Sequence, residues 1–330
     1  MDATLRAVIT GTGMCLPEKV LTNFDLAKMV DTTDEWIVTR TGIRERRIAA
    51  PNVATSDLGA AAASQALSEA GIAANDLDLI IVASVTPDNV FPCTACHVQR
   101  IIGASKAAAF DLSVACAGFV YGLAVADGFI RSSSPLRNIL VIGAECLSRI
   151  VDYTDRTSCI LFGDGAGAAV VQAKHDGRGI LGSCLGADGA QGDLIIVPAG
   201  GSRTPASLDT VQNRMHYMKL KGREVFKFAV IKMVEMVETS LRQCGLTLAD
   251  VNLIIPHQVN MRIIEAAIER LGISREKVFV NIDRYGNTSA ASVPIALHEA
   301  RTSGRLKRGD TVVLIGFGAG LAWGASVIRW

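Results

Sequence analysis

The sequence predicts an α/β protein built from two similar halves. Short apolar runs typical of buried strands alternate with segments of helical periodicity along the chain, as in layered α/β folds. Three apolar runs of the first half also recur in the same order in the second half, although generic strands could imitate part of this repeat. The paired runs are 78–82 with 252–256, 138–143 with 311–316, and 165–171 with 323–328.

The division between the halves is expected where the apolar pattern is interrupted. The segment Lys174-His175-Asp176-Gly177-Arg178 is polar and rich in turn-forming residues, which predicts halves of residues 1–173 and 174–330. A second irregular stretch, 198–210, is rich in Gly, Ser and Pro and predicts a surface loop.

Composition excludes several classes of protein. The 330 residues are 49% hydrophobic and 20% charged, and the net charge of +1 argues against a nucleic-acid partner. No apolar run is long enough to span a bilayer, so a membrane partner is not expected. The eight cysteines without a recognisable secretion signal predict reduced thiols and a cytoplasmic location.

The most informative stretch surrounds Cys116. This cysteine lies between a strand predicted over 108–112 and a helix predicted over 119–130. Backbone N–H groups at the start of a helix, together with the helix dipole, favour a thiolate, which predicts a nucleophile near neutral pH. A buried cysteine that acts as a small hydrophobe is the alternative that this stretch alone leaves open.

Two other strand ends carry the groups that such a nucleophile lacks. His257 follows the apolar run 253–256 and precedes a helix predicted over 261–271, while Asn287 lies in a turn before a helix predicted over 292–300. Cysteine, histidine and asparagine can together attack a thioester and stabilise the negative charge of an enolate. A core histidine and an ordinary turn asparagine are the alternative interpretations.

Other motifs are assigned to structure. Cys93-Thr94-Ala95-Cys96-His97 matches the C-x-x-C-H haem attachment pattern, but no export signal is found, so packing is the preferred interpretation and no haem or metal is expected. Two glycine motifs, at residues 163–167 and 316–320, lack the dinucleotide-binding spacing and predict tight turns between strands.

Seven motifs in one order carry a resemblance to a known family. They are Thr33-Asp34-Glu35-Trp36-Ile37, Arg40-Thr41-Gly42-Ile43, Ala115-Cys116-Ala117-Gly118, Phe162-Gly163-Asp164-Gly165-Ala166-Gly167, Pro256-His257-Gln258-Val259-Asn260, Tyr285-Gly286-Asn287-Thr288-Ser289 and Gly316-Phe317-Gly318-Ala319-Gly320. Over essentially its whole length the chain resembles the β-ketoacyl-[acyl-carrier-protein] synthases III, thiolase-like condensing enzymes that start bacterial fatty-acid chains. The resemblance implies a thiolase-like fold whose duplicated α/β halves form five layers, αβαβα.

The resemblance also implies a reaction, the decarboxylative condensation of a short acyl-CoA, expected to be acetyl-CoA, with malonyl-acyl carrier protein. Cys116 would carry the acyl group, while the backbone N–H groups of Cys116 and Ala319 would form the oxyanion hole. His257 and Asn287 would donate to the malonyl thioester carbonyl, and Phe317 would exclude water. The family usually has glycine where Ala319 stands, so alanine serves only if its backbone conformation is allowed.

Binding surfaces follow from the same resemblance. The positions that match CoA contacts are Trp36, Arg40, Arg156 and Asn260. Those that match carrier-protein docking are Lys227 and Arg262. Phe91 matches a residue that closes the acyl pocket of the partner subunit, which implies a homodimer. Acyl-CoA is a substrate in this scheme, and no cofactor is expected.

The main alternative is a ketosynthase III-like enzyme of secondary metabolism, of the polyketide or quinolone type, or an acyltransferase with another acyl donor. A thiolase would need a second catalytic cysteine near the end of the chain, and none follows Cys244. An elongating synthase would carry histidine where Asn287 stands. A non-catalytic CoA- or carrier-binding protein on this fold is the alternative outside enzymes, and the complete Cys, His and Asn set argues against it.

Overall fold

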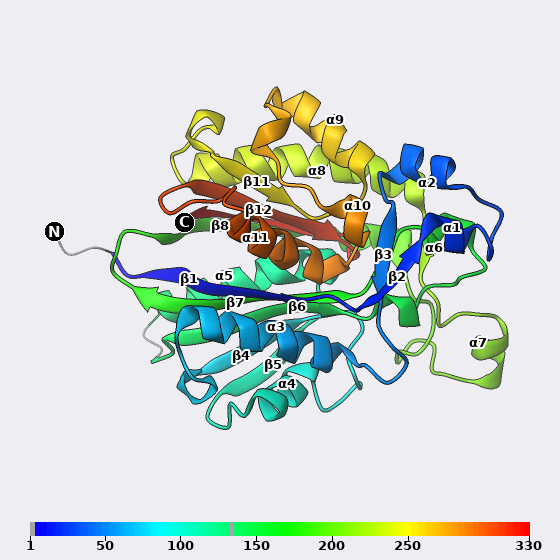
Figure 1. The fold of residues 1–330 in the computed structure, drawn as a ribbon, viewed down its shortest axis with the longest axis horizontal. Coiled ribbons are helices and arrows are strands. Elements are labelled where there is room, and N and C mark those ends of the chain that lie inside the picture. The colour runs from blue at the N-terminus through cyan, green and yellow to red at the C-terminus, as the bar shows by residue number, and fades with distance from the viewer. Residues whose placement is uncertain (1–3, 133–134) are drawn as a thin grey trace.

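Two mixed β-sheets form the centre of the protein. The computed structural model describes residues 4–132 and 135–330 (Figure 1). The first sheet has the order β1 (Arg6–Cys15), β7 (Gly165–Lys174), β6 (Asn138–Glu145), β4 (Leu79–Ala83) and β5 (Ala108–Leu112). The second has the order β11 (Leu253–Pro256), β12 (Thr311–Gly318), β13 (Ala322–Arg329) and β8 (Gly179–Ala187).

The second sheet repeats the pattern of the first. In the first sheet β4 pairs with β6 in parallel, and β7 pairs with β6 and β1 antiparallel; β11, β12, β13 and β8 repeat these pairings in the same order. The three repeated sequence runs are therefore equivalent strands, as predicted. The second sheet has no full strand equivalent to β5 among the described residues. At that position beside β11 there is a single parallel bridge, between Ile254 and Val278. The chain passes between the sheets after Lys174, and the division at residue 173 stays a prediction.

Helices complete the five layers, so the predicted fold class is confirmed (Figure 1). The helices α5 (Gly118–Arg131) and α11 (Ser292–Thr302) pack between the two sheets in one apolar core. The helices α3 (Thr55–Ala70) and α4 (Thr94–Ile102) cover the outer face of the first sheet, and α8 (Gly222–Gln243) and α9 (Met261–Leu271) cover that of the second. Because both faces of each sheet are covered, strands such as β4 are apolar throughout rather than alternating.

Short elements gather at one end of the two sheets (Figure 1). They are β2 (Lys19–Thr22), α1 (Asn23–Leu26), α2 (Asp34–Thr41), β3 (Glu45–Ile48), α6 (Arg156–Cys159), β9 (Ile195–Ile196), α7 (Leu208–Gln212), β10 (Lys219–Leu220) and α10 (Ile282–Tyr285). The loop predicted over 198–210 ends early, because the Ser207 side chain accepts from the Thr210 N–H and caps α7. Within the described residues, every helix is too short or too polar to cross a bilayer.

The prediction of tight turns for the two glycine motifs is wrong for most of their glycines. Gly165 and Gly167 lie in β7, and Gly316 and Gly318 lie in β12. A Cβ on Gly167 would come within 2.7 Å of the Ile295 nitrogen in α11. These glycines thus allow helices to approach the strands closely, rather than reversing the chain.

One such contact joins the two halves directly and gives a test of the packing. A Cβ on Gly143 of β6 would lie 2.1 Å from the carbonyl oxygen of Ala290 in the second half. We expect Gly143→Ala to lower the free energy of unfolding by about 1–3 kcal/mol, since neighbouring backbone must move. Urea denaturation measures the change.

Gly128→Ala is the matched control for that variant. Gly128 lies in α5, is exposed, and its Cβ would meet nothing within 4 Å. Alanine forms helix better than glycine, so this variant should be more stable by up to about 1 kcal/mol. Equal effects of the two substitutions would contradict the proposed close contact between the halves.

Candidate active site

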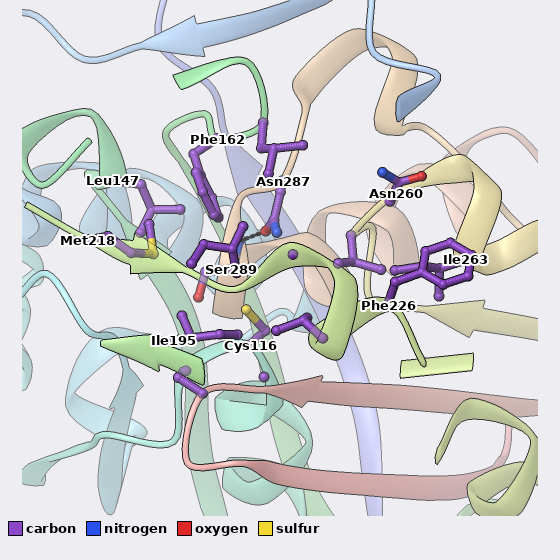
Figure 2. A pocket seen from close by; sticks show the side chains of 18 of the residues that line it. Cys116, Leu147, Phe162, Ile195, Met218, Phe226, Asn260, Ile263, Asn287 and Ser289 are labelled. Carbon is purple, nitrogen blue, oxygen red and sulfur yellow. Dashed lines mark hydrogen bonds between the residues drawn. The ribbon is translucent and has the colours of Figure 1, made fainter. Parts of the chain in front are cut away.

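Cys116, His257 and Asn287 line one cavity of about 500 Å³ at the end of the sheets where the short elements gather. Figure 2 shows the side chains of Cys116, Asn287 and Ser289 directed into this cavity. Its wall is largely apolar. The apolar residues around it include Leu147, Phe162, Ile195, Met218, Phe226 and Ile263.

Two equivalent turns bring the cysteine and the asparagine together. Cys116 lies in the 3-10 turn Ala115–Ala117 between β5 and α5, and the turn Ser289–Ala291 precedes α11 in the same way. Each turn opens with a left-handed residue, Ala115 at φ 43° and Ser289 at φ 48°. By this alignment the positional equivalent of Cys116 is Ala290, and Asn287 lies three residues before it.

Burial favours the neutral form of the Cys116 thiol. It is half-buried, and desolvation raises its pKa to about 12, well above the ordinary value for a thiol. Burial therefore opposes the thiolate that the position at the helix N-terminus was expected to favour. Gly318 is what leaves room for this thiol, since a Cβ there would lie 3.2 Å from the Cys116 sulfur.

His257 is held as a neutral hydrogen-bond donor. It is 1% exposed, and burial lowers its pKa to about 3, so the ring is uncharged at neutral pH. The Ser292 hydroxyl lies 2.6 Å from Nδ1 and can also accept from the Gln258 N–H at 3.5 Å. With Ser292 donating to Nδ1, the proton of the neutral ring is on Nε2. Phe317 packs edge-on against this ring, with centroids 5.6 Å apart.

Asn287 is oriented by its own turn. Its Oδ1 accepts from the Ser289 N–H at 2.8 Å, the contact drawn as a dashed line in Figure 2. The amide NH₂ group is left to donate to a ligand. Asn287 and His257 can therefore both offer N–H groups to an oxygen in the cavity.

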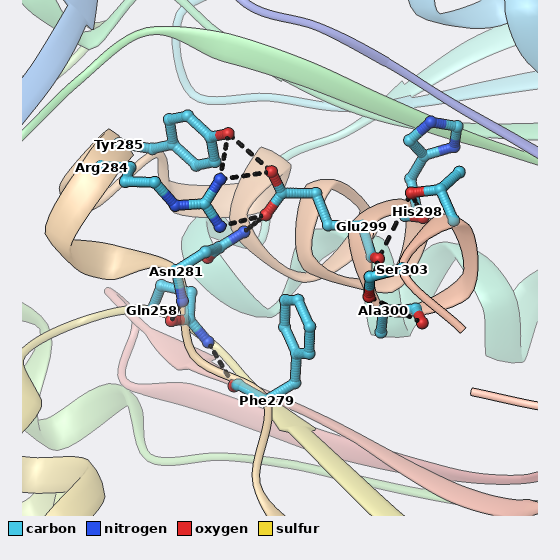
Figure 3. A network of polar contacts seen from close by, with 10 residues as sticks. Gln258, Phe279, Asn281, Arg284, Tyr285, His298, Glu299, Ala300 and Ser303 are labelled. Carbon is cyan, nitrogen blue, oxygen red and sulfur yellow. Dashed lines mark hydrogen bonds and ion pairs between the residues drawn. The ribbon is translucent and has the colours of Figure 1, made fainter. Parts of the chain in front are cut away.

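A polar network behind the site fixes the segments that carry these residues (Figure 3). Gln258, next to His257, accepts from the Asn281 N–H at 3.0 Å. The Asn281 amide donates to Glu299 of α11 at 2.8 Å, and Arg284 and Tyr285 also bind this carboxylate, at 2.9 and 2.6 Å. These hydrogen bonds connect the segment after β11, which carries His257, and the turn before Asn287 to the same helix, α11.

Glu145 is a buried carboxyl beside the cysteine that sequence analysis missed. It ends β6, is fully buried, and accepts from the Thr86 hydroxyl at 2.6 Å and the Val85 N–H at 3.1 Å. Desolvation raises its pKa, and its charge contributes to the raised pKa of Cys116. The signal was available, because Glu145 is a polar residue directly after a predicted strand. Ser292, the first residue of a predicted helix, carried no comparable signal.

The backbone at Ala319 suits alanine. Ala319 lines the cavity beside Gly318. Among the described residues other than glycine, a positive φ occurs at Ala115, Arg214 and Ser289 only, so Ala319 is not in the left-handed region. The following residue, Gly320, takes φ 141° instead. Alanine can therefore replace the family's usual glycine at this position without backbone strain.

The four residues matched to CoA contacts lie together on the cavity wall. The guanidinium groups of Arg40 and Arg156 stack on the Trp36 ring at 4.6 and 5.1 Å from its centre. The Asn260 amide donates to the Arg40 carbonyl at 3.1 Å. This part of the wall therefore presents a flat aromatic surface beside two cations, which suits a nucleotide and its phosphates.

The remaining predicted positions lie farther out. Arg262 is exposed, lines the cavity, and stands 5.9 Å from the Phe226 ring. Lys227 is exposed on α8 and does not line the cavity. Phe91 is 84% exposed and also lies away from the cavity of its own chain.

Comparisons with known proteins identify the family of the chain. Residues 110–189 match the model of 3-oxoacyl-[acyl-carrier-protein] synthase III, and residues 241–330 match that of its C-terminal part. The β-ketoacyl-[acyl-carrier-protein] synthase III of Caldanaerobacter subterraneus subsp. tengcongensis is 58% identical over 330 residues, which cover 100% of this chain and 99% of that one. The chain belongs to the β-ketoacyl-[acyl-carrier-protein] synthase III family.

Solved structures of the family have the same fold. The 3-oxoacyl-[acyl-carrier-protein] synthase III of Aquifex aeolicus superposes with a TM-score of 0.91 at 49% identity, covering 98% of this chain and 100% of that one. The priming β-ketosynthase of the R1128 polyketide pathway has a TM-score of 0.90 at 34% identity, covering 99% and 96%. The Aquifex enzyme thus shares more sequence identity with this chain than the polyketide enzyme does, although the two folds superpose almost equally well.

The raised pKa of Cys116 predicts how the free thiol reacts. Alkylation by iodoacetamide requires the thiolate, so its rate should rise about tenfold per pH unit from about pH 7 to about pH 9. Intact-mass measurement of the wild type against Cys116→Ala isolates this site. A rate that levels off near neutral pH would show that the helix N-terminus outweighs burial.

The contact between Ser292 and His257 gives a second prediction. Ser292→Ala removes the hydroxyl that contacts Nδ1, so the ring loses the contact that fixes its tautomer and orientation. We expect decarboxylation of malonyl-acyl carrier protein to slow about tenfold or more, with acyl loading of Cys116 retained. Ser303→Ala is the control, because this serine follows the same helix and binds only backbone carbonyls. An unchanged rate of decarboxylation in Ser292→Ala would show that Ser292 does not position the His257 ring.

Proposed function

We propose that this chain catalyses the decarboxylative condensation of a short acyl-CoA, acetyl-CoA in the first instance, with malonyl-acyl carrier protein. The observation that supports this most is the convergence of Cys116, His257 and Asn287 on one apolar cavity. Membership of the synthase III family agrees with it, and its relatives carry the acyl carrier protein in their names.

In the first half-reaction the Cys116 sulfur attacks the acyl-CoA carbonyl. Because the thiol pKa is about 12, its proton leaves during the attack rather than before it. The tetrahedral oxyanion accepts from the backbone N–H groups of Cys116 and Ala319. The bond between the carbonyl carbon and the CoA sulfur then breaks, CoA leaves and takes up one proton, and the acyl group remains on Cys116.

In the second half-reaction malonyl-acyl carrier protein loses carbon dioxide. The electrons of the breaking C–C bond move towards its thioester carbonyl oxygen, where the N–H groups of His257 and Asn287 donate. A neutral imidazole serves this purpose, and the apolar wall around Phe317 favours release of an uncharged product. The carbanion then attacks acyl-Cys116, the acyl C–S bond breaks, and the thiol takes up a proton.

The outer residues complete the proposal. Trp36, Arg40, Arg156 and Asn260 would hold the nucleotide end of CoA, a role that their stacking and common wall support. Exposed Lys227 and Arg262 would attract an acidic carrier protein. The reaction needs no cofactor or metal, and the enzyme would work in the cytoplasm.

We further propose a homodimer in which Phe91 closes the acyl pocket of the partner. Phe91 and Val90 are 84% and 91% exposed, which is unusual for large apolar side chains. Strand β5, in the same half, is the edge strand of its sheet. A pocket shortened by Phe91 would limit the acyl group to a short chain. The polyketide-type alternative is the less supported one, because that enzyme is the less similar relative.

The direct test is intact-mass measurement after mixing with acyl-CoAs of graded length. Acetyl-CoA should acylate the wild type, Cys116→Ala should take no acyl group, and Cys146→Ala, a buried cysteine outside the cavity wall, should load normally. Acylation that persists in Cys116→Ala would overturn the mechanism. Octanoyl-CoA loading as fast as acetyl-CoA would favour the alternative enzyme class.

The division of roles is tested with the other two residues. His257→Ala and Asn287→Ala should still accept an acetyl group on Cys116. Their release of carbon dioxide from malonyl-acyl carrier protein should fall about a hundred- to a thousandfold, because each lacks one donor to the enolate oxygen. Equal losses in loading and decarboxylation would show that the roles are wrongly divided.

A further inference from the structure

Cys93 and Cys96 form a thiol pair that the proposed reaction leaves unused. Cys93 is the residue just before the first helical residue of α4, where its side chain makes no capping hydrogen bond, and Cys96 lies in the first turn of that helix. The Cys93 and Cys96 sulfurs lie 3.3 Å apart, in hydrogen-bond contact, and both residues are half-buried. A movement of about 1.2 Å would bring the sulfurs from 3.3 Å to the disulfide bond length of about 2.05 Å.

We propose that Cys93 and Cys96 are a redox modification site, which forms a reversible intramolecular disulfide with hydrogen peroxide as oxidant and thereby shifts the adjoining turn Val90–Pro92. Packing alone does not require two sulfurs in hydrogen-bond contact at a helix N-terminus. The C-x-x-C spacing places the second sulfur one helical turn after the first, as in thiol–disulfide oxidoreductases.

The chemistry balances with one peroxide for each pair of thiols. The Cys93 sulfur attacks one peroxide oxygen, the O–O bond breaks, and the leaving hydroxide takes up a proton to give water and a sulfenic acid. The Cys96 sulfur then attacks the Cys93 sulfur, the S–O bond breaks, and a second water leaves. Dithiothreitol reverses the bond by thiol–disulfide exchange.

Cys93 is the thiol expected to react first. It lies before the first helical residue of α4 and directly follows the exposed Val90–Pro92 turn, from which peroxide can approach. Its hydrogen bond raises the pKa of Cys96, which suits Cys96 to the later, resolving step. Cys116 is protected by comparison, because desolvation raises the pKa of its thiol to about 12.

The anchoring of α4 determines what moves when the bond forms. The Asp111 carboxylate of β5 accepts from the N–H groups of Thr94 and Ala95 at 2.7 and 2.8 Å, which fixes the first turn to the sheet. Cys93 precedes this anchor and follows the exposed Val90–Pro92 turn. When the disulfide forms, Cys93 and the turn before it are therefore the parts that move.

This consequence rests on the proposed function, in which Phe91 of that turn closes the partner's acyl pocket. Displacing a group that borders reacting atoms by about 1 Å can change a rate by up to about a hundredfold. Oxidation would then alter which acyl groups load, without touching Cys116.

The first arm of the test measures the disulfide itself. Protein with Cys116→Ala, which removes the active-site thiol, is titrated with hydrogen peroxide and weighed intact. We expect a loss of two hydrogens that dithiothreitol reverses, and a peptide map that links Cys93 to Cys96. Adding Cys93→Ser or Cys96→Ser should abolish the link, while Cys15→Ser, another half-buried cysteine, should keep it. A loss that survives Cys93→Ser, or no link at all, overturns the proposal.

The second arm measures the shift of the turn. The ratio of butyryl to acetyl loading on Cys116 is compared before and after oxidation, and should change about tenfold in the wild type and not in Cys93→Ser. A mapped disulfide with an unchanged ratio overturns the shift. Failure of the reduced wild type to load any acyl-CoA would instead reject the proposed function, because the first arm is independent of activity.

Discussion

The close approach of the two halves is the constraint on which the active site depends. Gly143 in β6 faces the carbonyl of Ala290, and a side chain there would collide with backbone. Gly316 in β12 likewise allows the approach of Ala117, whose Cα would lie 2.8 Å from an added Cβ. These reciprocal contacts let the two turns, one from each half, meet over the edge of the sheets. Cys116 can lie beside His257 and Asn287 because glycines at these contacts let the two halves approach closely.

Desolvation then determines the chemistry of the site. It keeps the Cys116 thiol protonated and the His257 ring neutral, since both charged forms are costly in an apolar cavity. A neutral histidine with its Nε2 proton in place can stabilise an enolate repeatedly, with no change in its own protonation. The same environment strengthens the hydrogen bonds to the developing oxyanions, because little water competes for them.

Much of this arrangement could be predicted from the sequence. The strand at 108–112 and the helix at 261–271 have the predicted bounds, and the three principal residues were found because polar groups follow apolar strands. Local pattern did not report burial depth, so the sequence did not reveal that desolvation raises the pKa of Cys116. It also did not report which segments meet across the halves, so Ser292 was missed and Gly316 was assigned to a turn.

The asymmetry between the two sheets bears on how large an assembly can grow. The edge at β5 is open in the chain, whereas the equivalent edge at β11 is occupied by the segment that pairs through Val278. Pairing of β5 with β5 across a twofold axis would consume the matching edge on both copies at once. A pairing of this kind leaves no β5 edge free on either copy, so a third chain could not be added at that edge.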